Sequence, residues 1–118
     1  MAELIPTEDE ECLALVDYLE LLKSMGKIVV FTHTANETYT KSWKQKARNT
    51  AQGVRAGVPD YVIVTLKRVL FLEMKRTKNS STSSFQKGWN KAINATENGR
   101  AAICHGFDEA KEWLDENI

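Results

Sequence analysis

Two short β-prone segments, Asp60–Thr65 and Val69–Lys75, lie only three residues apart in the chain. They are rich in valine, with isoleucine, leucine and phenylalanine, and runs of this length and composition favour strands over helices. So short a link predicts a tight antiparallel hairpin. Antiparallel pairing then brings Asp60, at the start of the first arm, beside Glu73 near the far end of the second.

Helices and further strands are predicted around this hairpin. The spacing of apolar residues predicts helices over about residues 8–24 and 83–98 and from Phe107 onward, with a weaker basic helix over 40–52. A short buried strand is predicted at Lys27–Thr32 and a last strand at Ala101–Cys104. The order α-β-(α)-β-β-α-β-α predicts an α/β fold in which helices flank a mixed sheet. We expect one domain over residues 1–118, since this length supports one modest core and no repeat or linker is visible.

The net charge of zero conceals a strong asymmetry along the chain. Residues 38–100 carry 13 Lys/Arg and 3 Asp/Glu, a local balance of +10, and the two ends together carry −10. A basic middle segment can form a cationic face for a polyanion, although charges can also cluster on an ordinary surface. No apolar run is long enough to span a membrane and no export signal is visible, so we expect a cytoplasmic protein.

Glu73 and Lys75 lie two residues apart on the predicted second arm and therefore share one face of the sheet. Either residue alone is explained by a strand that emerges into solvent, and Asp60 alone by a turn after Pro59. Two carboxylates and a lysine that meet at one end of a hairpin need another reason. Mg²⁺ supplies one, because it takes oxygen ligands and often only one or two protein carboxylates.

The ordered motifs resemble a known family. Gly57-Val58-Pro59-Asp60, Phe71-Leu72-Glu73-Met74-Lys75 and Gln86, with the acidic helix at Glu8–Glu11, resemble the VRR-NUC family of PD-(D/E)XK nucleases, in its standalone viral and bacterial form. The resemblance covers roughly residues 8–110. It implies a restriction-endonuclease-like fold. It also implies a Mg²⁺- or Mn²⁺-dependent DNA endonuclease, selective for branched or junction DNA, in the replication, repair or recombination of a virus or bacterium.

The resemblance also implies roles for individual residues. Asp60, Glu73, the Met74 carbonyl and one acid of the first helix would hold the metal, Lys75 would orient the attacking hydroxide, and Gln86 would lie beside the lysine and the water. For the helix acid, Glu8 continues the predicted buried stripe and Glu11 lies at its edge. The family spacing favours Glu11, with Glu8 second. Gln86 also has a structural interpretation, as the partner of Ser83 in a helix capping box.

The basic segment predicts a surface for DNA. No acid occurs between Glu37 and Asp60, while basic residues gather there; those expected to contact phosphates are Lys41, Lys44, Arg48 and Arg55. A solvated helix face is the alternative. Two reduced buried thiols, Cys12 and Cys104, are expected in place of a disulfide, and His33 and His105 are interpreted as structural residues because no Cys/His spacing indicates zinc.

Two other classes of function remain open at this point. One is a nucleic-acid-binding module that kept this fold and lost catalysis, and the other is an interaction domain whose charges only decorate the surface. For the nuclease we expect DNA as the partner, a homodimer that can cut two strands of a junction, and no small-molecule cofactor. The cell of a bacterium or of an infected host is the expected location.

Overall fold

A computed structural model describes residues 5–34, 42–76 and 81–118. These residues form four helices and four strands. In order they are α1 (Glu8–Ser24), β1 (Val30–His33), α2 (Trp43–Ala51), β2 (Tyr61–Val64), β3 (Val69–Lys75), α3 (Ser84–Asn94), β4 (Gly99–His105) and α4 (Phe107–Asn117). The α/β class and the predicted order of elements are confirmed.

The four strands form one mixed sheet in the order β1-β2-β3-β4. β1 pairs with β2 and β2 with β3 in antiparallel fashion, so the predicted hairpin is present. β3 and β4 run parallel, and α3 makes the connection between them on one face of the sheet. A crossover of this kind is what a parallel pair requires.

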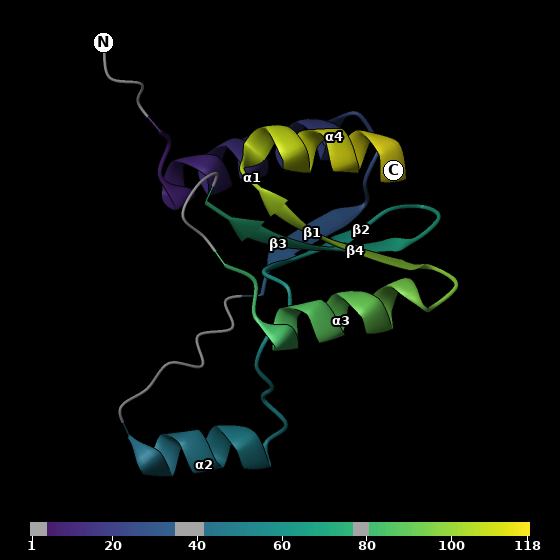
Figure 1. Cartoon of the computed structure of the whole chain (residues 1–118). Coiled ribbons are helices and arrows are strands. Elements are labelled where there is room, and N and C mark those ends of the chain that lie inside the picture. Colours follow the sequence, from purple (N-terminus) through teal and green to yellow (C-terminus); the bar gives the residue numbers. More distant parts are fainter. Residues whose placement is uncertain (1–4, 35–41, 77–80) are drawn as a thin grey trace.

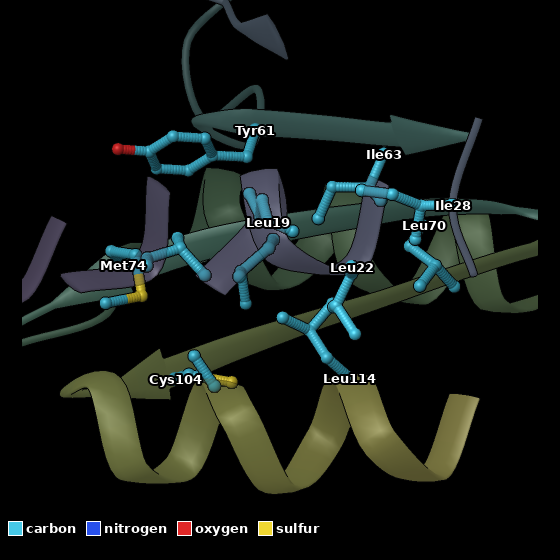
Figure 2. Packing of buried hydrophobic residues seen from close by; sticks show 12 residues of the cluster. Leu19, Leu22, Ile28, Tyr61, Ile63, Leu70, Met74, Cys104 and Leu114 are labelled. Carbon is cyan, nitrogen blue, oxygen red and sulfur yellow. The ribbon is translucent and has the colours of Figure 1, made fainter. Parts of the chain in front are cut away.

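Side chains that alternate along β3 separate the two faces of the sheet. Leu70, Leu72 and Met74 are buried in the core, on the face that α1 and α4 cover. Figure 2 shows this core, where Leu19 and Leu22 of α1 and Leu114 of α4 meet the strand residues. Phe71, Glu73 and Lys75 therefore point to the opposite face, where Figure 1 places α3.

The apolar stripe of α1 differs from the predicted one. Its buried residues are Glu11, Leu15, Leu19 and Leu22, whereas Glu8, predicted to continue the stripe, is exposed. The observed spacing of four, four and three selects a helix face slightly rotated from the predicted face. Cys12 is only partly buried for the same reason, while Cys104 is fully buried and both thiols are free.

The first strand is also not the buried strand that was predicted. It begins at Val30 instead of Lys27, and three of its four residues are exposed. Its position explains this, because β1 is an edge strand that pairs with β2 alone. Ile28, which precedes it, is buried in the core, and Phe31 is half-buried against it.

α2 stands apart from the rest of the molecule. Figure 1 shows it beyond α3 and away from the sheet, and none of its residues is buried. Ser42 caps its first turn by accepting a hydrogen bond from the Gln45 N–H at 3.2 Å. Within the described ranges, no helix combines the length and the apolar composition that crossing a membrane requires.

Candidate active site

The hairpin places Asp60 opposite Glu73. The register pairs Tyr61 with Leu72, so the residues just outside this pair are Asp60 and Glu73. The Asp60 carboxylate accepts a hydrogen bond from the Met74 backbone N–H at 3.2 Å, and its side chain is also hydrogen-bonded to Glu73. The two carboxyl groups therefore meet at one end of the sheet, beside the Met74 peptide.

The end of β1 holds the backbone of Asp60 in position. Its backbone carbonyl accepts a hydrogen bond from the Thr34 N–H at 2.6 Å, and the Thr34 hydroxyl donates to the Pro59 carbonyl at 3.0 Å. Pro59 is fully buried. The turn before Asp60 is thus tied to the end of β1, which fixes the direction in which the carboxylate points.

Glu73 is a buried acid with a strongly perturbed pKa. Its exposed fraction is 6%. Burial, followed by the hydrogen bond to Asp60 and the negative charge of Asp60, raises the pKa of Glu73 to about 9. The positive charge of Lys75 and a hydrogen bond from Gln86 oppose this increase. Without a cation, the pair therefore retains a proton at neutral pH.

Lys75 and Gln86 complete the group around Glu73. Lys75 follows two residues later on the same face of β3 and is half-buried. The Gln86 Oε1 accepts a hydrogen bond from the Ser83 N–H at 3.0 Å, and the Ser83 hydroxyl accepts one from the Gln86 N–H at 3.1 Å. The Gln86 side chain also hydrogen-bonds to Glu73. Gln86 therefore caps α3 and contacts the carboxyl pair at the same time.

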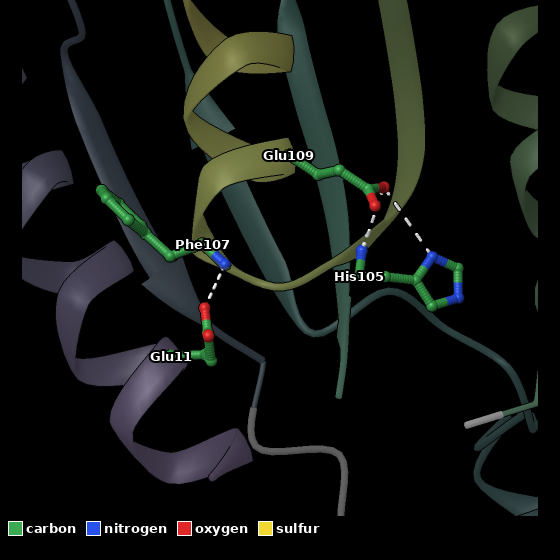
Figure 3. Close-up of polar contacts among 4 residues, drawn as sticks. All are labelled: Glu11, His105, Phe107 and Glu109. Carbon is green, nitrogen blue, oxygen red and sulfur yellow. Dashed lines mark hydrogen bonds and ion pairs between the residues drawn. The ribbon is translucent and has the colours of Figure 1, made fainter. Parts of the chain in front are cut away.

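The N-terminal acids lie in two different surroundings. Glu11 is buried, and its carboxylate accepts a hydrogen bond from the Phe107 N–H at the start of α4 (Figure 3). α4 has no side-chain cap from its own N-cap residue, Gly106, so Glu11 takes that place. Glu8 is exposed; burial and a hydrogen bond to Cys12 raise the pKa of Tyr61, and the negative charges of Asp60 and Glu8 add smaller contributions.

No third acid completes a metal-binding group in the described part of the chain. Among residues 5–34, 42–76 and 81–118, no three His, Cys, Asp or Glu side chains lie close enough together to hold a metal ion. Asp60 and Glu73 are close to each other, but neither Glu11 nor Glu8 joins them in this structure.

The residues predicted to contact DNA do not gather at the carboxyl pair. Lys44 and Arg48 are exposed on α2, and Lys41 lies outside the described residues. The Arg55 guanidinium donates to the backbone carbonyls of Thr50 and Val54 at 3.1 and 3.0 Å, at the C-terminal end of α2. Arg55 therefore has a structural role in holding that end, which the sequence analysis did not anticipate.

The two histidines have local partners. The His33 ring lies 4.9 Å from the Tyr61 ring. The His105 ring Nδ1 lies 3.8 Å from the Glu109 Oε1, and the His105 backbone N–H donates to the same oxygen at 3.2 Å (Figure 3).

One polar residue near the site was missed in the sequence. Asn90 lies one turn after Gln86 on α3, and its Oδ1 is buried with no hydrogen-bond partner within the described residues. A buried acceptor of this kind normally pairs with a donor, water or an ion. The signal was the four-residue spacing of Gln86, Asn90 and Asn94, which gives α3 a polar row as well as an apolar stripe.

Comparisons with known proteins support the fold. No family model matches the chain, and no curated protein matches it. A solved structure described as a "VRR_NUC domain protein" matches with a TM-score of 0.66 and 20% sequence identity, over 100% of this chain and 91% of that one. At that identity the likeness establishes architecture, not activity. The resemblance read from the motifs is thus confirmed in structure: this chain has the fold of a VRR_NUC domain protein.

Proposed function

We propose that the protein is a metal-dependent DNA endonuclease that hydrolyses phosphodiester bonds. The observation that carries this proposal is the buried Glu73 carboxyl, in hydrogen-bonding contact with Asp60 and within the field of Lys75. Burying an acid against a second acid costs folding free energy, and such perturbed groups concentrate at functional sites. The VRR_NUC-type fold supports the same assignment.

The donor atoms at this end of the sheet fit a hard divalent cation. Asp60 and Glu73 offer carboxylate oxygens, and the Met74 peptide beside them offers a carbonyl. Mg²⁺ and Mn²⁺ take such oxygen ligands and keep several waters, so two carboxylates and one carbonyl are sufficient. When bound, the ion would supply positive charge for the phosphate and make a water more acidic.

The other residues would position the reacting groups. The Lys75 amine would orient the attacking water on the same face as Glu73. Gln86, held by the capping box, would fix the rotamer of Glu73 by its second hydrogen bond. Each of these residues acts through a contact with Glu73 or with the water, so neither needs to bind the ion.

A further ligand would come from α1, and two acids compete for this role. Glu11 was favoured by the family spacing, but here its carboxylate caps α4 and would have to leave the Phe107 N–H. Glu8 is exposed, and within the described residues no hydrogen bond to another element would have to break for its carboxylate to reach an ion. We therefore place Glu8 before Glu11, which stays the alternative.

DNA is the proposed substrate, and α2 is the proposed phosphate-binding element. Lys44 and Arg48 share one exposed face of a helix that has no acidic residue. Contacts of this kind hold DNA without reading its sequence. We also propose that the substrate is branched or junction DNA, that the protein acts as a homodimer, and that it serves repair or recombination.

The decisive experiment is a cleavage assay on duplex, flap and four-way-junction DNA with Mg²⁺ and with Mn²⁺. Asp60→Ala and Glu73→Ala should abolish cleavage while circular dichroism shows an unchanged fold. Lys75→Ala should lower turnover about 100-fold or more, as expected for loss of a group that acts on the water, and should leave Mn²⁺ binding intact in calorimetry. Glu10→Ala, an exposed acid of α1, is the matched control and should cut as the wild type does. Wild-type cleavage by Asp60→Ala or Glu73→Ala would refute the site.

A nucleic-acid-binding module of the same fold is the second candidate. The exposed cations of α2, Lys44 and Arg48, favour it over an interaction domain, because they would contact phosphates whether or not a metal is bound. A thermal-shift measurement separates the two functions. Strong stabilisation by Mn²⁺ that Glu73→Gln removes is expected for the nuclease, and DNA binding with no response to Mn²⁺ is expected for the inactive module.

A further inference from the structure

Helix α3 turns polar side chains and Ile93 toward the sheet and leaves Phe85 exposed on another side. Gln86 bonds to Glu73 of β3, and the Asn94 amide bonds to the backbone N–H and carbonyl of Ala101 in β4 at 2.9 and 3.0 Å. Phe85 lies on a different side of the helix, the neighbouring Trp89 is half-buried, and no residue of α3 is fully buried. The exposed fraction of Phe85 is 64%. A helix whose whole apolar side covered a core would bury this ring, so the Phe85 ring is available to a ligand.

An open cavity lies along the apolar stripe of α3. Its volume is about 380 Å³, and its lining is almost entirely apolar, formed by Ser84, Phe85, Gly88, Trp89 and Ala92. The volume is within the range of small-molecule sites and is sufficient for one planar aromatic group. Ser84 supplies the polar side chain among the lining residues.

The start of α3 is held firmly against the turn that precedes Asp60. The Trp89 Nε1 donates to the Ala56 carbonyl at 3.0 Å. Gly57 has a φ of +86°, and a Cβ at this position would lie 2.6 Å from the Phe85 carbonyl carbon. The Phe85 ring is therefore carried on backbone fixed to the same turn as Asp60, and the next residue, Gln86, touches Glu73.

The charges around the stripe identify the class of ligand. α3 carries Lys87 and Lys91 and no acid, and Asp60 and Glu73 are the only acids in the sequence between residues 38 and 96. Lys87 and Lys91 follow Phe85 and Trp89 by two residues each, so they lie on another side of the helix and make the surroundings of the stripe cationic. A flat aromatic group that carries negative charge suits these surroundings, and an unpaired nucleotide has this chemistry.

We propose that Phe85 and Trp89 form a stacking platform for an unpaired base of DNA beside the phosphate that is cleaved. The proposal rests on the proposed function for the identity of the ligand as DNA, and it narrows the substrate to DNA with unstacked bases near the cut, such as a flap, a gap or an open junction. Exposed aromatic rings next to cationic residues bind single strands in this way without regard to sequence. In a fully paired duplex the bases stay stacked on each other, so no base is free to stack on Phe85.

The test compares affinities for a short oligo-dT strand and for a blunt duplex, in metal-free buffer with EDTA. Phe85→Ala should weaken binding of the single strand about 5- to 150-fold, the range for loss of one aromatic–base stack, and leave the duplex unchanged. Phe85→Leu should lose as much, because it keeps the apolar volume but removes the ring, and Phe85→Tyr should retain binding. Leu66→Ala is the matched control, since Leu66 is 83% exposed at the hairpin tip and away from α3. With a 2-aminopurine strand, the wild type should quench the probe and Phe85→Leu should not.

Three results would overturn the platform. They are equal affinity of Phe85→Ala and wild type for the single strand, full affinity of Phe85→Leu, and a change from dimer to monomer in sedimentation of either variant. Because binding is measured without metal, failure of the platform is distinct from failure of the nuclease. If the wild type cuts DNA and Phe85→Ala binds the single strand as well as the wild type does, the platform alone is refuted. If the single strand binds through Phe85 but no DNA is cut, the nuclease alone is refuted.

Discussion

The two faces of the sheet have opposite characters. The face under α1 and α4 is covered by fully buried residues such as Leu15, Leu72 and Leu114. The face under α3 holds a carboxyl pair, a lysine and a row of amides, and the helix over it has no buried residue. Packing on the first face stabilises the fold and holds the strands in place. The second face can therefore carry polar groups that lower the free energy of unfolding. The comparison predicts that mutations on the two faces will separate into effects on unfolding and effects on ligands.

Substitutions of apolar residues should show the largest contrast. Leu114→Ala removes a fully buried side chain and should lower the free energy of unfolding by about 2–5 kcal/mol. Phe85→Ala removes a larger but exposed side chain and should change it by less than about 0.5 kcal/mol. Urea unfolding measures both. Similar losses for the two variants would show that α3 is part of the core in solution.

The carboxyl pair should make the stability of the metal-free protein depend on pH. In the folded state the pKa of Glu73 is raised to about 9 from an ordinary 4.5, so the folded protein binds a proton that the unfolded chain releases. That stabilisation is complete below pH 4.5 and is lost as the pH rises toward 9. The melting temperature should therefore fall over this interval, by about 4 °C for each 1 kcal/mol lost.

Glu73→Gln should flatten this pH dependence, and Glu97→Gln, an exposed acid at the far end of the sheet, should not. Mn²⁺ should stabilise the wild type most at high pH, where the cation replaces the missing proton. A wild-type melting temperature that stays level from pH 5 to pH 9 contradicts the buried pair.

Cationic residues of α2, on the α3 side of the sheet, should bind DNA, and those of α1 and α4 on the other side should not. Replacing Lys44 and Arg48 together with alanine should lower the slope of log K against log salt by about 2 units, from two lost phosphate contacts. Lys23 and Lys111, on α1 and α4, form the matched control pair and should leave the slope unchanged. Titration of a fluorescent duplex from low to moderate salt gives both slopes. Equal slopes for the two double variants would mean that DNA does not follow α2.

The N-terminal acids give the smallest and sharpest comparison. Glu11→Gln should lower the unfolding free energy by about 0.5–2 kcal/mol, because it weakens the cap of α4. Glu8→Gln should leave stability unchanged and reduce Mn²⁺ affinity. Thermal melts with and without Mn²⁺ distinguish these outcomes. If Glu11→Gln instead loses metal affinity at full stability, then Glu11 leaves α4 to bind the ion.

Local patterns were sufficient to predict much of the fold. The bounds of β3 and α1 follow from alternation and capping, and the hairpin places Asp60 beside Glu73 with no information from distant residues. Edge position cannot be read from an apolar run, so the apolar residues at the start of this segment predict a buried strand, whereas β1 is mostly exposed. Helical periodicity shows that α3 has an apolar stripe but not which side meets the sheet. The position of Glu11 depends on a tertiary contact with α4, and that of Arg55 on nearby backbone carbonyls at the end of α2.

The same contacts between α1 and α4 bear on how the chain folds during synthesis. The Phe107 N–H donates to Glu11 across 96 positions, and the Tyr18 hydroxyl donates to Asp115 across 97. The leucines of α1 are made long before α4 and meet it only after α4 has left the ribosome. Contacts so distant in sequence slow folding and leave apolar surface open in the meantime. We therefore expect the nascent chain to remain a chaperone client until α4 emerges, and to fold in a single late step.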